Sequence, residues 1–283
     1  MTDTSATAIA SYGADRDWLL RFCPPHLAQS LGALFEIEHQ VGTSLRAGLE
    51  HSVAHTRLEW WSDELTRLAQ GSPRHPTTRE LAALATARGV TPPDLTPLIE
   101  HVRVDLACVA FLDRTELDLH FEAWARSLFR AVTLLEFDMA APADRATAEK
   151  LAADAGPLVR ELERLRHFSE HAIAGRIYLP LGDPPSSHLP WSAQTLGENE
   201  RRTLDARRQM LRERLREVVA EVAPQQRAAL RVPLLWIASA VNADHDDAAL
   251  LAPLRRTIRT WRSAFTLSRG RLPSALTSRP RHP

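Results

Sequence analysis

The chain has 283 residues, with 35 Lys and Arg against 35 Asp and Glu and with 44% hydrophobic residues. The length suits one large domain or two modest ones, and the composition excludes a wholly disordered chain, a collagen-like chain and a multi-span membrane protein. The equal numbers of positive and negative charges provide no overall basic surface, so no nucleic-acid partner is expected.

Apolar residues recur with a helical period in nearly every segment, and the alternation typical of strands is almost absent. In chain order, the predicted helices cover residues 26–41, 52–69, 77–88, 94–111, 115–137, 144–173, 198–222, 225–241 and 248–268. Short connections with Pro and Gly favour antiparallel neighbours in one bundle. The predicted fold class is therefore all-α, with one helical domain at 18–269, a flexible N-terminus at 1–17 and a flexible Arg/Pro tail at 270–283.

The cysteines and the N-terminus indicate the compartment. Cys23 and Cys108 are too few for a disulfide framework, and we expect both to be buried reduced thiols. No secretory signal precedes residue 18, and no apolar run reaches the ~20 residues of a spanning helix. A cytoplasmic location is expected. Six arginines between Arg255 and Arg271 add peripheral contact with anionic lipid or an acidic partner as an expectation.

The most informative segment runs from Arg166 through Gly175-Arg176-Ile177-Tyr178-Leu179-Pro180. It resembles the squalene/phytoene synthase family, in which a helix ends in an Asp-x-x-x-Asp motif followed by Gly-Arg-x-Tyr-Leu-Pro. The segment 57–65 is similar to the family's Arg-x-x-Trp-Trp-x-x-x-Leu helix. Residues 73–76 and 116–118 are similar to its His-Pro and Glu-Leu-Asp elements. The resemblance implies a single-domain isoprenoid (terpenoid) synthase-like helical bundle.

Members of this family condense two prenyl diphosphates head to head. Two aspartate-rich motifs hold Mg²⁺ ions that bridge the departing diphosphate, and Mg²⁺ prefers an octahedron of oxygen ligands. By resemblance, the pocket face of this chain would carry candidate site residues from the predicted helix 144–173 and the segment after it: Arg160, Glu163, Arg166, His167, His171, Arg176 and Tyr178.

The sequence departs from the family at the metal-binding positions. His167 and His171 stand where the second motif has its aspartates, and imidazole is a poor Mg²⁺ ligand. Arg160, Glu163, His167 and His171 follow an i, i+3, i+7, i+11 spacing, which predicts one shared helical face. The first motif is reduced to two opposing carboxylates, Glu36 and Glu38, which lie two residues apart.

The path for the prenyl chains is also altered by resemblance. Where the family has small residues in an Ala-Gly-x-x-Gly arrangement, the chain has Arg126 and Phe129 in place of the glycines and His120 in place of a tyrosine upstream. These residues are expected to narrow or fill the tunnel. A buried Arg126 would need a carboxylate partner or solvent.

Two functions follow from these departures. In the first, the protein is a catalytically degenerate member that acts as a binding, accessory or assembly protein, as in the family branch that assists assembly of respiratory complex I. Its partner would be a protein or an isoprenoid or lipid ligand, and no cofactor is expected. In the second, it is an active prenyl-diphosphate transferase acting on farnesyl or geranylgeranyl diphosphate. Glu36, Glu38 and Glu163 would then recruit Mg²⁺, while Arg160, Arg166 and Arg176 would hold phosphate oxygens.

Two other features of the sequence could in principle bind a metal: the histidine pairs and an acidic run. The i, i+4 pairs His51–His55 and His167–His171 lack a third ligand with a recognisable spacing, so structural or solvent-facing roles are favoured and no metal is expected. The acidic run at residues 244–247 is interpreted as a polar loop that caps the next helix.

Overall fold

The computed structural model describes residues 17–135, 142–181, 197–242 and 252–277. These residues form helices and turns without a strand, so the all-α prediction is confirmed. The first half contains α2 (Asp17–Leu20), α3 (Pro25–Gly42), η2 (Thr43–Leu45), α4 (His51–Ala69), α5 (Pro76–Ala87), α6 (Pro97–Ala107) and α7 (Arg114–Trp124). The second half contains η3 (Ala125–Phe129), α8 (Arg130–Leu134), α9 (Pro142–Arg166), α10 (Phe168–Ile173), α11 (Glu198–Ala220), η4 (Pro224–Gln226), α12 (Arg231–Asn242), α13 (Ala252–Leu267) and α14 (Ser274–Thr277).

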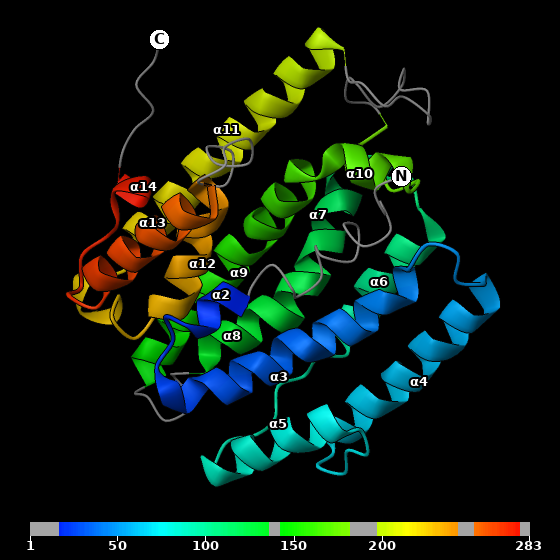
Figure 1. Ribbon diagram of the computed structural model, residues 1–283, viewed down its shortest axis with the longest axis horizontal. Helices are drawn as coiled ribbons and strands as arrows, with labels where there is room; N and C mark the ends of the chain where they lie inside the picture. The colour runs from blue at the N-terminus through cyan, green and yellow to red at the C-terminus, as the bar shows by residue number, and fades with distance from the viewer. Residues whose placement is uncertain (1–16, 136–141, 182–196, 243–251, 278–283) are drawn as a thin grey trace.

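Helix α9 is the central element of the bundle. It packs against α7, α8, α11 and α12, and α3 lies across the neighbouring α6 and α8 (Figure 1). Helices α4 and α5 follow one another along the outer side of α3 and both run in the direction opposite to it, and α13 and α14 lie at the opposite end beside α12. Apolar side chains from Leu19 on α2 to Leu276 on α14 belong to one continuous core.

Helix starts follow from local side-chain chemistry. Asp113 precedes α7, and its carboxylate accepts a hydrogen bond from the backbone N–H of Glu116 at 3.1 Å. The Glu116 carboxylate accepts from the N–H of Leu112 at 2.8 Å, so two otherwise unpaired donors are satisfied at once. Asp94 accepts from the N–H of Thr96, and α6 begins three residues later than the sequence predicted.

Two predicted helices are interrupted. The segment predicted as 115–137 contains η3, a single turn of π-helix, between α7 and α8. The segment predicted as 144–173 breaks at His167, whose φ of −103° and ψ of 31° lie outside the helical region. Both breaks lie in the part of the bundle where the buried polar residues gather.

Three other expectations differ from the structure. The tail predicted as flexible from residue 270 contains α14, because Leu276 inserts into the core and is only 2% exposed. Cys108 is exposed rather than buried, since it ends α6 in the left-handed conformation with a φ of 50°, and Cys23 is half-buried.

Some predicted segments lie outside the described residues. They are the N-terminal residues 1–16, the acidic run at 244–247 and most of the loop at 175–197.

The α4–α5 connection is fixed by a buried carboxylate. Glu64 accepts hydrogen bonds from the backbone N–H groups of Arg74 and His75 at 2.7 and 2.8 Å, and from the Thr78 hydroxyl. Burial alone would raise the pKa of Glu64, but these hydrogen bonds, together with one from Arg67, lower it.

Within the described part of the chain, no helix combines the length and apolarity needed to cross a bilayer.

Candidate functional site

A cluster of buried polar side chains lies where α3, α6, α7, α9 and α10 meet. We call it the buried polar cluster, and its members are Glu38, His101, Asp105, His120, Arg160, Arg164, His171 and Tyr178. Each member is at most 6% exposed. A buried charge is tolerated only when it is paired and hydrogen-bonded, so the partners of each member define what the cluster can do.

Asp105 on α6 is the centre of the cluster. Its Oδ2 accepts a hydrogen bond from Arg164 Nη2 at 2.9 Å, and its Oδ1 accepts one from the Tyr178 hydroxyl at 2.8 Å. His120 Nε2 lies 3.1 Å from the same Oδ1, without the alignment of a hydrogen bond. Burial by itself raises the pKa of this carboxyl, but the interactions with His101, Arg164 and His120 hold it well below the usual range. Asp105 is therefore a buried carboxylate anion at neutral pH.

His101 lies between Asp105 and Arg160, with its Nε2 3.6 Å from Asp105 Oδ2. Its Nδ1 lies 3.0 Å from the backbone carbonyl of His120, and its Nε2 lies 3.2 Å from Arg160 Nη2. Since a guanidinium only donates, His101 accepts at Nε2 and carries its proton on Nδ1. Burial, reinforced by the charges of His120 and of the two arginines, places the pKa of His101 well below its ordinary value. The ring is therefore neutral.

Arg160 and Arg164, one turn apart on α9, are both fully buried. Arg160 Nη1 lies 3.7 Å from Glu38 Oε1 on α3 and 3.5 Å from Glu163 Oε2. Both guanidinium groups stack on aromatic rings, Arg160 over Trp124 at 4.7 Å and Arg164 over Tyr178 at 5.2 Å. These contacts supply the attraction and packing that a buried charge requires.

Both glutamates that face Arg160 also accept from a tryptophan. The Trp124 indole N–H donates to Glu38 Oε1 at 2.8 Å, and the Trp236 indole N–H donates to Glu163 Oε1 at 2.8 Å. Their oxygens are therefore engaged in direct hydrogen bonds as well as in ion pairs.

The structure separates the four residues that the sequence placed on one helical face. Because α9 ends at Arg166, Arg160 and Glu163 face α3 and α12, whereas His171 on α10 receives a hydrogen bond from Arg164 Nη1 at 3.4 Å. His167 is half-buried, and its Nδ1 lies 3.2 Å from Glu170. The prediction of a continuous face is wrong at His167. Burial and the nearby arginines lower the pKa of His171 well below its ordinary value.

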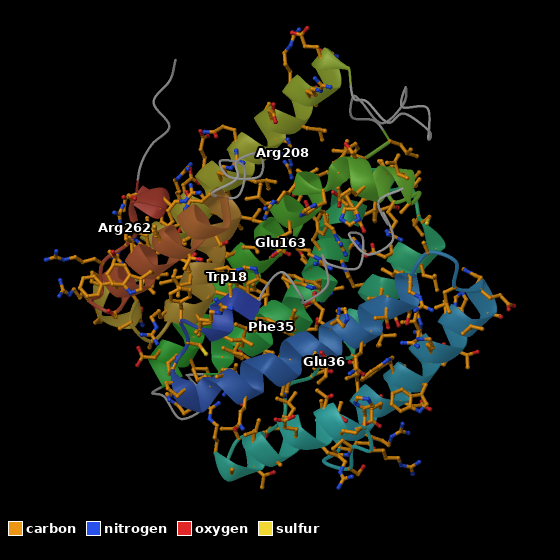
Figure 2. The ribbon with its side chains drawn as sticks, viewed as in Figure 1. Trp18, Phe35, Glu36, Glu163, Arg208 and Arg262 are labelled. Carbon is orange, nitrogen blue, oxygen red and sulfur yellow. The ribbon has the colours of Figure 1, made fainter. Side chains whose placement is uncertain are left out.

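The two predicted opposing carboxylates lie on different sides of α3. Glu38 is buried in the cluster, whereas Glu36 is exposed and accepts a hydrogen bond from Gln40. Figure 2 marks Glu36 on α3 and Glu163 on α9. Glu36 therefore does not belong to the cluster, because residues two apart on a helix point in different directions.

Two of the three predicted tunnel-filling residues are buried, and the third is exposed. His120 is buried and stacks on His101, with ring centroids 4.1 Å apart, and Phe129 is buried against Trp236. Arg126 is exposed, so the expectation that it fills the interior is wrong. It lies in the π-helical turn and reaches solvent, which avoids burying an unpaired charge.

The remaining predicted residues belong to the α9–α10 end of the bundle. Tyr178 joins the cluster through Asp105. Arg176 is buried, and its backbone N–H donates to the carbonyl of His171 at 2.9 Å. Arg166 is half-buried at the last residue of α9. The predicted pair His51–His55 is exposed on α4, with Nε2 atoms 2.9 Å apart.

Sequence reasoning missed His101, Asp105 and Arg164, which carry most of the cluster. The signal was present in α6, where Asp105 continues the apolar spacing of Ile99 and Val102 and so lies on the buried stripe. A charged residue on such a stripe predicts a buried partner. Its identity comes from α9, about 60 residues away in the chain, and no spacing rule links the two helices.

The donor set does not suit Mg²⁺. A magnesium-diphosphate site needs several carboxylate oxygens free to bind the ion. Here the oxygens of Glu38 and Asp105 are hydrogen-bonded to Trp124, Arg164 and Tyr178, and two buried guanidinium groups repel an added cation.

A transition-metal site is disfavoured for the same reason. His101, Asp105 and His120 place one potential ligand atom each within 4.8 Å of one another. The His101 lone pair already accepts from Arg160, and Asp105 accepts from Arg164. A bound ion would have to displace both guanidinium groups.

Two surface hollows lie away from the cluster. One is lined by residues of α9 and α11 together with Gln226, and the other by residues of α5 and the loop before it. No member of the buried polar cluster lines either hollow.

The helical bundle organised around α9 defines an all-α isoprenoid synthase-like fold. The model of the family described as squalene/phytoene synthase matches residues 9–250. The chain therefore belongs to the squalene/phytoene synthase family. No curated protein and no solved structure is similar enough to the chain to be matched.

Proposed function

We propose that this family member is catalytically degenerate and acts as a binding protein in an accessory or assembly role. The observation that carries the proposal is the pairing of Arg160 and Arg164 with Glu38 and Asp105 inside the bundle. Head-to-head condensation needs carboxylates that are open to Mg²⁺ and to diphosphate. The buried carboxylates of this chain are instead held by fixed guanidinium, indole and phenol donors.

The histidines at the second motif strengthen the proposal. His171 is buried and neutral beside Arg164, and His167 is half-buried beside Glu170. Neither imidazole can replace an aspartate as a hard oxygen ligand. The chain has therefore exchanged a metal-binding centre for a charge-paired structural centre.

A binding role also needs an exposed surface that a partner can bury. Val109, Leu112, Ile173 and Leu181 are 43–66% exposed on two adjoining segments. The Leu181 N–H donates to the Phe111 carbonyl at 2.8 Å, which holds the segments together. Apolar side chains gathered in this way are typical of a protein interaction site. We call these four residues the loop patch and infer that it contacts a protein partner.

The first experiment tests the loss of catalysis. The purified protein is incubated with Mg²⁺ and farnesyl or geranylgeranyl diphosphate, and diphosphate release is measured. We expect no release above the protein-free reaction. The alternative function, an active prenyl-diphosphate transferase, predicts Mg²⁺-dependent release that disappears in Glu38→Gln and persists in Glu36→Gln, whose side chain lies outside the cluster. That result would overturn the proposal.

The second experiment tests the binding role. The tagged protein is cross-linked in cell extract, and co-purifying proteins are quantified for the wild type, for Leu112→Glu and for Val53→Glu. Val53 is the control because it is an exposed apolar residue on α4 and is not one of the four residues of the loop patch. We expect a partner that is lost with Leu112→Glu and retained with Val53→Glu. Equal recovery with both variants would remove the loop patch from the proposal.

A further inference from the structure

Helix α13 presents an apolar stripe to solvent. Ile258, Trp261 and Phe265 are 42%, 58% and 47% exposed. Their spacing of three and four residues places them on one face. Thr260 and Leu267 are buried on the inner side of the same helix, toward α12. The exposed stripe is thus separate from the face that anchors α13 to the bundle.

Arginines border this stripe. The rings of Trp261 and Phe265 stack with centroids 5.8 Å apart and an interplanar angle of 13°. The Arg269 guanidinium lies 4.1 Å from the centroid of Phe265. Arg262 is exposed at the edge of the molecule that α13 forms (Figure 2). One surface therefore combines two stacked aromatic rings with cationic groups.

The C-terminal part of the chain, which includes α13, has basic residues and no acidic ones. Residues 248–283 contain eight arginines and no aspartate or glutamate. On α11, by contrast, arginines pair with neighbouring glutamates, as in Arg202–Glu198 and Arg214–Glu217. The arginines of α11 thus have acidic neighbours on the same helix, whereas residues 248–283 contain no acidic residue beside their arginines.

We propose that the exposed face of α13 is a membrane-interface surface that seats the protein on anionic lipid. Tryptophan and other aromatic side chains favour the headgroup level of a bilayer, and arginines attract anionic headgroups. A helix with an apolar face beside basic residues lies in the interface plane. The apolar stripe supplies burial and the arginines supply charge complementarity, and a lipid surface accommodates both without a shaped groove. This inference is independent of the proposed loss of catalysis.

The experiment is co-sedimentation of the full chain with vesicles. One set contains phosphatidylcholine alone, and the other contains phosphatidylcholine with phosphatidylglycerol. We expect binding to the anionic vesicles that weakens as salt is added, because screening reduces the attraction. Neutral vesicles should bind at least about tenfold more weakly, given the contribution of each basic residue near a charged surface.

Two pairs of variants assign the binding to α13. Trp261→Ala is compared with Trp60→Ala, since Trp60 is also exposed but lies on α4. The double variant Arg262→Gln with Arg269→Gln is compared with Arg201→Gln, whose side chain is exposed on α11. We expect the α13 variants to lose about tenfold or more in affinity and the controls to bind as the wild type does. Circular dichroism verifies that each variant remains folded.

Three outcomes would overturn the proposal. The first is equal binding to neutral and anionic vesicles. The second is an equal loss for Trp60→Ala and Trp261→Ala. The third is a dimer in lipid-free light scattering that Trp261→Ala dissociates, because the stripe would then be an interface between two copies of the chain.

Discussion

At the residue scale, the main feature is a set of buried charged side chains that are paired with one another. Asp105 accepts hydrogen bonds from an arginine and a tyrosine within 2.9 Å, and His101 lies between Asp105 and Arg160. Removing one partner from such a network leaves the others buried without compensation, which is far more destabilising than losing a surface pair. A substitution at one of the cluster positions on α6 or α9 is therefore expected to lower the stability of the protein.

The buried histidines make stability depend on pH. Burial first, and nearby positive charge second, lower the pKa of His101 and His171 well below 6.5 in the folded state. The unfolded chain takes up protons at the ordinary value of about 6.5, so below that pH it binds more protons than the folded chain. We predict that the free energy of unfolding falls as the pH is lowered from 7.5 to 5.5, by up to about 1.4 kcal/mol per pH unit for each histidine.

Urea unfolding at the two pH values measures this effect. His171→Asn should reduce the pH dependence, and His26→Asn, at an exposed position on α3, should leave it unchanged. A wild-type stability that is constant between pH 7.5 and 5.5 would contradict the assignment of neutral buried imidazoles.

At the element scale, the close approach of α9 to the π-helical turn controls the packing of the bundle centre. A Cβ atom added at Gly156 would lie 2.7 Å from Ala125 Cβ and 3.2 Å from Phe129 Cδ1. Neither neighbour is the free end of a long flexible side chain. The glycine on α9 therefore allows η3 to pack against it at this distance.

We predict that Gly156→Ala destabilises the protein although alanine is the better helix former. Overpacking costs about 1–3 kcal/mol, which exceeds the gain in helix propensity of about 1 kcal/mol. Gly32→Ala on α3 is the matched control, because its added Cβ would meet only Leu20 Cδ1, at 4.0 Å. It should increase the unfolding free energy by about 0.5–1 kcal/mol. Chemical denaturation of both variants measures the difference, and stabilisation by Gly156→Ala would refute the packing argument.

At the scale of the whole molecule, both described ends of the chain help to close one core. Leu19 on α2 and Leu276 on α14 are each at most 2% exposed and belong to the same apolar cluster. The Arg216 guanidinium also donates to the Ala275 carbonyl at 3.0 Å, which ties α14 to α11. The C-terminal segment is therefore part of the folded unit as far as residue 277.

We predict that a chain that ends after Arg269 is less stable than one that ends after Thr277. The shorter chain loses the burial of Leu272 and Leu276, which contributes about 1.5–3 kcal/mol for a fully buried leucine. The longer one loses only residues 278–283. Thermal or urea unfolding of the two truncated chains provides the comparison. Equal stability of the two would mean that α14 contributes nothing to the core.

The sequence by itself determined the helical class, most helix positions and the family, because periodicity and local motifs are properties of neighbouring residues. It named Arg160, His171 and Tyr178 as pocket-face candidates and Glu38 as a possible opposing carboxylate, and these four residues lie in the buried polar cluster. It placed Arg126 and His167 wrongly, because a π-helical turn and a helix break change the direction of side chains without a clear local signal.

Only the tertiary structure decided what the site contains. Asp105 and Arg164 are 59 residues apart in the chain and meet at 2.9 Å because α6 and α9 pack in the same bundle. The packing also determines which groups are ionised. Burial disfavours a charge, but the positive partners of Asp105 lower its pKa and keep it an anion. For His101 and His171, burial and nearby positive charge both lower the pKa, so these rings are neutral. Periodicity specifies which face of a helix is buried, and the three-dimensional arrangement specifies which charges share that interior.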